Sequence, residues 1–163
     1  YSNSFSKVKS LSSISREINL RASYAPDRAL ESFIELFKVR VNKIAVVGLA
    51  FKGSPETNDI RGSTSLEFVR RIEKKYQVRI YDFGMNKIEI KNLNLLVGKN
   101  DLEIPKDIDC VFILNNHIKN KYLKINNWLN TPKIKLIFDG WNQYTYLESF
   151  SKNLIYTTMG KIK

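Results

Sequence analysis

Short, mostly apolar runs recur along the chain at intervals typical of alternating strands and helices. Each ends beside a polar or small residue, as expected of strands that are buried on both faces of a parallel sheet. The runs that predict strands are 44–48, 78–81, 110–114, 135–138 and 154–156. Helical patterns lie between them, so the predicted fold class is α/β: a doubly wound, mostly parallel, Rossmann-like sheet preceded by a helical arm.

Periodic apolar positions predict the helices of this fold. After Pro26, apolar residues at 30, 33, 34 and 37 follow the spacing of an amphipathic helix. Thr64 and Glu67 form a capping-box pattern at the start of a helix that continues to residue 75. Weaker patterns predict helices over 120–129 and 144–150. Residues 85–104 favour a short helix and a weak strand near 95–97.

The amino-terminal part of the chain has a different pattern. Residues 1–15 are rich in serine and weakly periodic, so we expect a frayed end or the tail of a preceding segment. Residues 15–23 favour a helix. The first residue is Tyr rather than Met, from which we expect a processed, trimmed or truncated chain. We therefore predict a helical arm over 1–40 and a Rossmann-like domain over 41–163.

Composition excludes several classes of protein. A chain of 163 residues buries a core without needing disulfides or a metal, and its single cysteine, Cys110, lies in an apolar run that fits a core position. No cluster of His, Cys and carboxylate residues suggests a metal site. No apolar stretch approaches the roughly 20 residues of a membrane span, and residues 1–40 lack the apolar core of a signal peptide. We expect a soluble, cytoplasmic protein.

The net charge points to anionic ligands without identifying one. Lys and Arg number 27 and Asp and Glu 16, which leaves a formal net charge of +11. Such a field attracts nucleic acid, an anionic membrane or a phosphorylated small molecule. The basic residues are spread among Asn and Ile, with no run of five or more. We therefore expect neither nucleic acid nor membrane as a partner, and a nucleic-acid-binding domain is the weakest of the alternatives.

Polar loops follow four of the predicted strands. They cover residues 48–62, 82–86, 115–119 and 139–143. Ligands of open α/β sheets bind outside the carboxyl ends of the strands, so these loops locate the site. The first loop lacks the glycine spacing that holds a dinucleotide pyrophosphate. Lys52 is placed either to meet an anion at the strand edge or to lie in solvent.

Several of these segments together resemble one enzyme family. Residues 47–52, with Phe51 and Lys52, and residues 58–63, with Asp59 and Arg61, are similar to the signature of the UDP-glucose/GDP-mannose dehydrogenase carboxy-terminal domain. The resemblance continues through 78–82, 111–114 with His117, and 137–140, and covers about residues 14–161 in consistent order. It implies a domain that binds the nucleotide sugar, most simply a UDP-sugar.

The family oxidises the C6 alcohol of a nucleotide sugar to a carboxylate by two successive hydride transfers to NAD. The resemblance implies that Phe51 and Lys52 contact the nucleotide sugar, that Asp59 holds the loop in shape, and that Arg61 reaches the cofactor. It also implies that residues 1–40 contain the end of a central helix on which the family builds homodimers. The products of such enzymes suggest polysaccharide biosynthesis.

The sequence departs from the family pattern in ways that limit this expectation. Trp141 stands where the family often has an arginine that contacts the nucleotide sugar, and an indole offers one N–H and a stacking face in place of a forked, charged donor set. Either the recognised sugar or nucleotide differs, or ligand binding is impaired, or Trp141 is a buried packing residue. The loop after Lys52 is longer than is common in the family. The glycine fingerprint for NAD and the family's catalytic cysteine belong to segments upstream, and Cys110 lacks the surroundings of a reactive thiol.

We therefore expect no catalytic residue in this chain and NAD bound mainly by another domain. His117, the only histidine, is either a ligand contact or a packing residue. The alternative to a dehydrogenase part is a stand-alone, non-catalytic module that binds nucleotide sugars or a protein partner. In that case the helix over 27–38 would pack on its own domain.

Overall fold

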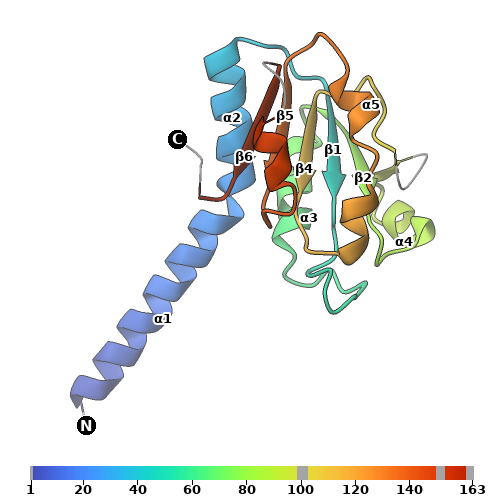
Figure 1. Cartoon of the computed structure of the whole chain (residues 1–163). Coiled ribbons are helices and arrows are strands. Elements are labelled where there is room, and N and C mark those ends of the chain that lie inside the picture. The colour runs from blue at the N-terminus through green and yellow to red at the C-terminus, as the bar shows by residue number, and fades with distance from the viewer. Residues whose placement is uncertain (1, 99–102, 150–152, 161–163) are drawn as a thin grey trace.

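Six strands pair in parallel in the order β3-β2-β1-β4-β5-β6 (Figure 1). The computed structural model describes residues 2–98, 103–149 and 153–160. The strands are β1 (Lys43–Val47), β2 (Gln77–Tyr81), β3 (Leu96–Val97), β4 (Cys110–Ile113), β5 (Lys135–Asp139) and β6 (Leu154–Thr158). The predicted doubly wound parallel sheet is confirmed, and the order reverses direction between β1 and β4.

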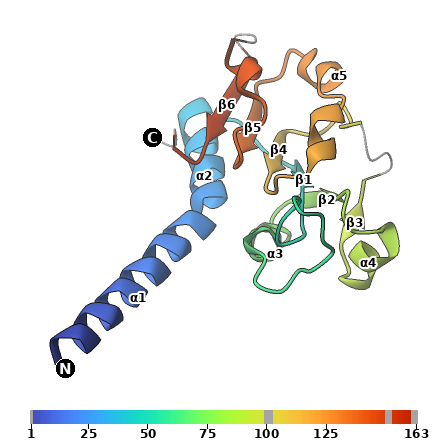
Figure 2. The same ribbon diagram turned by 60° about the horizontal axis from the view of Figure 1, so that its bottom comes forward.

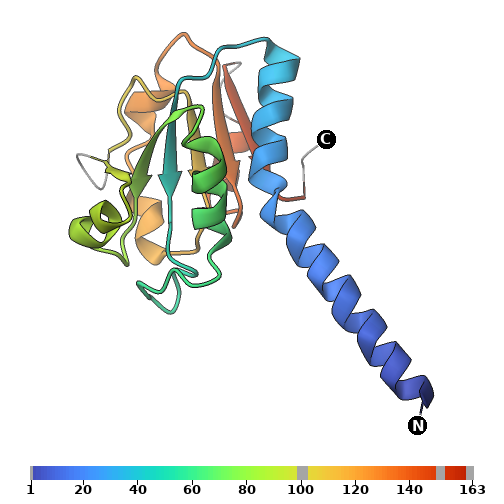
Figure 3. The ribbon, with the colours of Figure 1, turned by 180° about the vertical axis from the view of Figure 1, so that it is seen from behind.

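Helices cover both faces of the sheet. Figure 3 shows α2 (Ala25–Phe37) and α3 (Thr64–Ile72) side by side on one face. The short helices η1 (Ile118–Tyr122), α5 (Asn126–Leu129) and η2 (Thr145–Ser149) lie on the other, and α4 (Lys87–Asn92) lies near β3. Successive residues of one strand point to opposite faces, so the strands other than β3 contribute to two cores.

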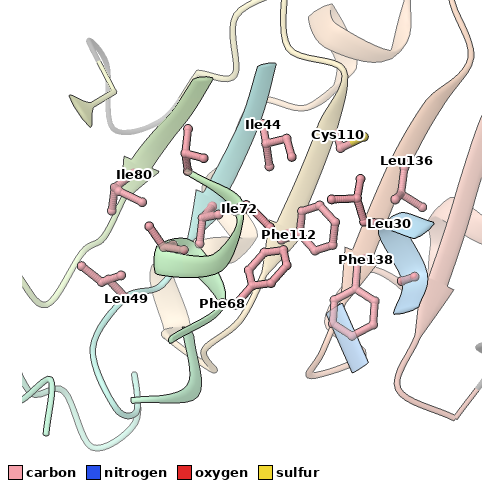
Figure 4. Packing of buried hydrophobic residues seen from close by; sticks show 14 of the residues in the cluster. Leu30, Ile44, Leu49, Phe68, Ile72, Ile80, Cys110, Phe112, Leu136 and Phe138 are labelled. Atoms are coloured by element: carbon pink, nitrogen blue, oxygen red, sulfur yellow. The ribbon is translucent and has the colours of Figure 1, made fainter. Parts of the chain in front are cut away.

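The larger core lies between the sheet and the α2–α3 layer (Figure 4). Ile44 and Val46 of β1 point into it, whereas Ala45 and Val47 point into the core under α5. The rings of Phe68 and Phe112 are 4.8 Å apart between their centroids, and they join α3 to the central strand β4. This packing fixes α3 on the sheet.

The long helix α1 (Ser2–Ser23) extends away from the sheet (Figures 1 and 3). The expectation of a frayed end over residues 1–15 is wrong for residues 2–15, which continue the helix predicted over 15–23; residue 1 lies outside the described residues. The helix breaks at Tyr24 because Pro26 has no N–H to donate and its ring would clash with the Ala22 carbonyl. The helical conformation resumes at Ala25, the first residue of α2.

Three local predictions need correction. The cap of α3 is Ser63 rather than Thr64, since the Ser63 hydroxyl accepts the N–H of Leu66 at 3.2 Å and donates to the Leu49 carbonyl at 2.6 Å. The helix predicted over 120–129 is split into η1 and α5, because Lys124 between them pairs with Glu103 in a parallel bridge. The helix predicted over 144–150 is the shorter 3-10 helix η2. Residue 150, the last of the predicted range, lies outside the described residues.

Candidate ligand-binding site at the carboxyl edge of the sheet

The four loops predicted to form the site meet at one edge of the sheet. Figure 2 brings this edge toward the viewer, with the long β1–α3 loop beneath the strand ends. α1 also leaves the body of the protein at this edge (Figure 1). The positions of these loops depend on two buried carboxylates.

The first carboxylate is Asp82, directly after β2. Its Oδ2 accepts the N–H groups of Leu49 at 2.6 Å and Ala50 at 3.0 Å. Its Oδ1 accepts the N–H groups of Gly84 at 2.7 Å and Met85 at 2.9 Å. Asp82 thus joins the β1–α3 loop to the β2–α4 loop, and both its oxygens are used in doing so.

The second carboxylate is Asp139, the last residue of β5. It accepts the N–H of Trp141 at 3.1 Å, the N–H of Tyr144 at 2.9 Å and the hydroxyl of Tyr156 at 2.8 Å. The side chain is fully buried. These bonds fold the loop after β5 back on itself and place Trp141 beside the end of β4.

The β1–α3 loop is also held by the loop after β4. Asn116 Oδ1 accepts the N–H groups of Gly53 at 2.9 Å and Ser54 at 3.0 Å. A Cβ atom on Gly53 would lie 2.2 Å from the backbone nitrogen of His117, so only glycine fits there. The two loops therefore touch through their backbones.

His117 is a packing residue of this contact. Its side chain is buried, its Nδ1 accepts the N–H of Lys119 at 3.1 Å, and its Nε2 lies 3.1 Å from a carboxylate oxygen of Glu56. Since Nδ1 accepts, the ring proton lies on Nε2 and is donated to Glu56. Of the two roles considered for His117, the structure favours packing.

The crevice where related folds bind a dinucleotide is filled. Gly48 has a φ of +90°, and a Cβ there would lie 2.3 Å from the side chain of Asn115. The acidic residue after β2, which binds ribose in dinucleotide sites, is Asp82, and its oxygens are occupied by backbone N–H groups. These residues do not fit NAD in that mode.

A pocket of about 220 Å³ lies beside this crevice. Phe51 and Trp141 line it from two different loops, and both are half exposed, at 57% and 50%. Thr64 and Ser65 at the start of α3 line a further part. The remaining lining residues are Ala22, Ser23, Pro26, Leu114, Phe138, Gly140 and Met159.

Trp141 lines this pocket with the one N–H of its side chain already bonded within the protein. Its Nε1–H donates to the carbonyl of Leu114 at 3.0 Å, which uses the single polar atom of the indole. An arginine at position 141 would supply several side-chain N–H groups, whereas Trp141 supplies an aromatic surface instead. Phe51 and Trp141 both give the pocket aromatic surface, and the first turn of α3 has backbone N–H groups that favour anions.

The structure brings together only two of the four predicted site residues. Phe51 and Trp141 share the pocket, whereas Lys52 and Arg61 are exposed and are not among its lining residues. Arg61 forms a forked ion pair with Asp59, with 2.7 Å between Nη2 and Oδ2. The hydrogen bonds from Arg61 hold the pKa of Asp59 down to about 2, so the pair stays ionised at neutral pH.

Two further predictions concern the reactivity of Cys110 and metal binding, and neither involves this pocket. Burial raises the pKa of the Cys110 thiol, which is fully enclosed in the core, so this cysteine is not an activated nucleophile. Among residues 2–98, 103–149 and 153–160, no three His, Cys, Asp or Glu side chains gather as metal ligands. No helix in the same ranges is long and apolar enough to cross a membrane.

Several residues of the site have no clear sequence signal. The α1–α2 junction lines the pocket through Ala22, Ser23 and Pro26. Thr64 and Ser65 follow the Asp59–Arg61 segment at the start of a helix. A helix that begins after a polar loop is the sequence signal that could have indicated them as site residues. Asp82 directly follows one strand and Asp139 ends another.

This arrangement defines a Rossmann-like domain with a pocket at the carboxyl ends of the strands and its dinucleotide crevice closed. The model of the UDP-glucose/GDP-mannose dehydrogenase family, UDP binding domain, matches residues 45–146. The chain belongs to this family. The match includes Phe51, Lys52, Arg61 and Trp141.

Solved structures of dehydrogenases share the fold. The UDP-D-ManNAc dehydrogenase of Pyrococcus horikoshii is 26% identical with a TM-score of 0.61, over 90% of this chain and 32% of that one. The UDP-N-acetyl-mannosamine dehydrogenase Cap5O of Staphylococcus aureus is 25% identical, with the same TM-score and coverage. The UDP-glucose dehydrogenase of Pyrobaculum islandicum, 21% identical with a TM-score of 0.55 over 83% of this chain and 29% of that one, shows the fold alone.

The chain thus spans about a third of the length of these enzymes. A comparison with curated protein sequences finds no match.

Proposed function

We propose that this chain is the nucleotide-sugar-binding part of an NAD-dependent nucleotide-sugar 6-dehydrogenase, with a UDP-sugar as its ligand. One observation carries the proposal: seven of the eleven residues that line the pocket, Phe51 and Trp141 among them, lie within the segment that matches the family's UDP-binding domain. Oxidation of an alcohol at C6 to a carboxylate removes two hydrides, one to each of two NAD molecules, and takes its second oxygen from water. The other domain of the enzyme supplies NAD and the catalytic cysteine.

The residues of the pocket have complementary roles in this proposal. Phe51 and Trp141 pack against the planar or apolar parts of the ligand, and the first turn of α3 faces its negative charge. Lys52 follows Phe51 directly and is exposed, so it is free to swing toward the diphosphate. Arg61, oriented by Asp59, points toward the cofactor on the neighbouring domain.

Calorimetric titration of the chain with UDP and with uridine tests these roles. We expect Lys52→Ala to weaken UDP binding by roughly tenfold, the effect of losing about 1.4 kcal/mol, and to leave uridine binding unchanged because uridine has no diphosphate. Phe51→Ala should weaken both ligands by similar factors. Lys74→Ala is the matched control, since Lys74 is an exposed lysine that follows α3 at its opposite end.

If the unsubstituted chain bound UDP no more tightly than it binds uridine, the proposed diphosphate contact would be wrong. Equal losses for UDP in Lys52→Ala and Lys74→Ala would show only the effect of net charge.

We further propose that residues 1–40 contain the end of a central helix and residues 41–163 the UDP-sugar-binding domain. α1 supports this because it leaves the body and exposes the apolar side chains of Leu11, Ile14 and Ile18. These lie at i, i+3 and i+7, on one side of the helix. A second copy of the chain would cover them in a homodimer.

One observation favours a second candidate, a non-catalytic nucleotide-sugar-binding module. α2 packs on its own sheet, with Ala29, Leu30 and Phe33 in the core. The mass of the native gene product separates the candidates. A denatured mass more than twice 19.0 kDa, with a native mass of two chains, is expected of a dimeric dehydrogenase. A denatured mass of about 19.0 kDa would support the module.

A further inference from the structure

The junction between α1 and α2 is held by one side chain from α3. Arg71 Nε donates to Asp27 Oδ1 at 3.0 Å, and its Nη2 donates to Asp27 Oδ2 at 2.7 Å. The same Nη2 donates to the carbonyl of Ser23, the last residue of α1, at 3.0 Å. A single guanidinium therefore binds both helices at the point where the chain changes direction.

Tyr24, the residue between the two helices, completes the contact. The guanidinium carbon of Arg71 lies 4.5 Å from the centroid of the Tyr24 ring, within the range of a cation–π contact. The planar group is thus bound at its edge by Asp27 and at its face by Tyr24. A lysine could not make both contacts.

This ion pair is better shielded from water than its neighbour on the same helix. The side chains of Arg71 and Asp27 are 28% and 17% exposed, against 43% and 29% for Arg70 and Glu73. The hydrogen bond to Asp27 raises the pKa of Arg71, so the charge is permanent. Forked, partly buried pairs contribute more than exposed ones.

The same junction forms a wall of the ligand pocket. Ala22, Ser23 and Pro26 line the pocket together with Thr64 and Ser65, which begin the helix that carries Arg71. α3 therefore contacts the pocket at one end and holds the junction near the other. A change in the direction of α1 would move Ala22 and Ser23 and alter the pocket.

We propose that Arg71 is a positioning residue that fixes the direction of α1 against the sheet and, with it, the α1–α2 wall of the ligand pocket. The identity of the ligand rests on the proposed function; the role of Arg71 in directing α1 does not. In an enzyme whose remaining part is attached through α1, this contact sets how the pocket faces that part.

Spin-label distances test the direction of α1. Labels at Ser10→Cys on α1 and Lys91→Cys on α4 occupy exposed positions, and the buried Cys110 does not compete for the label. We expect one narrow distance distribution in the parent chain. Arg71→Met should broaden this distribution. Asp27→Asn removes the negative charge of the same ion pair and should broaden it similarly.

Arg70→Met is the control, because Arg70 lies on the same helix and binds Glu73 and the Leu93 carbonyl instead of the junction. It should leave the distribution narrow. If Arg71→Met and Asp27→Asn remained folded with a distribution as narrow as the parent, the inference would be overturned.

UDP titration of the same variants tests the pocket wall. We expect roughly fivefold weaker binding for Arg71→Met and Asp27→Asn and no change for Arg70→Met. Broadened distances with unchanged UDP affinity would overturn the coupling to the pocket. Failure of the parent chain to bind UDP would count against the proposed function, and the label distances would still decide whether Arg71 directs α1.

Discussion

Replacing Asp82 by alanine is expected to lower the free energy of unfolding by about 3 kcal/mol or more. The substitution leaves four backbone N–H groups without their acceptor, and those of Leu49 and Ala50 are buried. Each buried donor that loses its partner costs about 1–3 kcal/mol, and only those that water reaches recover part of this. Urea denaturation followed by circular dichroism measures the change.

The same substitution should weaken UDP binding, because Leu49 and Ala50 lead directly into Phe51. Asp107→Ala is the control: Asp107 pairs with Lys43 at 2.6 Å, but its side chain is 45% exposed. Exposed pairs contribute up to about 1 kcal/mol, so this variant should stay close to the parent. Similar losses for the two variants would mean that Asp82 acts as an ordinary surface charge.

Alanine at Gly53 should disrupt the site by steric conflict alone. The new Cβ would lie 2.2 Å from the nitrogen and 2.4 Å from the Cα of His117, and these backbone atoms cannot rotate away. We expect a loss of about 2–3 kcal/mol in the free energy of unfolding if the loops stay together. If the β1–α3 loop moves instead, UDP affinity should fall by roughly tenfold or more, since Phe51 and Lys52 move with it.

Gly62→Ala provides the matched control in the same loop. Gly62 has a φ of +69°, and a Cβ added there would meet no atom within 4 Å, so alanine costs only the left-handed conformation, roughly 1–2 kcal/mol. UDP binding should be preserved. Unchanged stability and unchanged UDP affinity in Gly53→Ala would contradict the close contact between the two loops.

The fold was predictable because the strands are short apolar runs. Residues 110–113 and 135–138 are buried on both faces, and short apolar runs of this kind indicate strands of a parallel sheet. The short helices were less predictable. A helical pattern over 120–129 does not show that Glu103, far away in sequence, pairs with Lys124 and interrupts it.

The site was predictable to a smaller extent. The sequence predicts both Phe51 and Trp141 as site residues. That they share one pocket depends on Asp139, which folds back the loop that carries Trp141. The role of His117 was open in the sequence, because a lone histidine after a strand is compatible with ligand contact and with packing. Its burial against Gly53 and Glu56 decided between them.

The α/β class, the parallel sheet and the family resemblance follow from local sequence patterns, because apolar runs and loop motifs act over a few neighbouring residues. The contacts between the loops, the filled dinucleotide crevice and the hold of Arg71 on the junction of α1 and α2 depend on the folded structure. These features join residues that are tens of positions apart. Their energies depend on distances and on exclusion of water, which arise only when the sheet has formed.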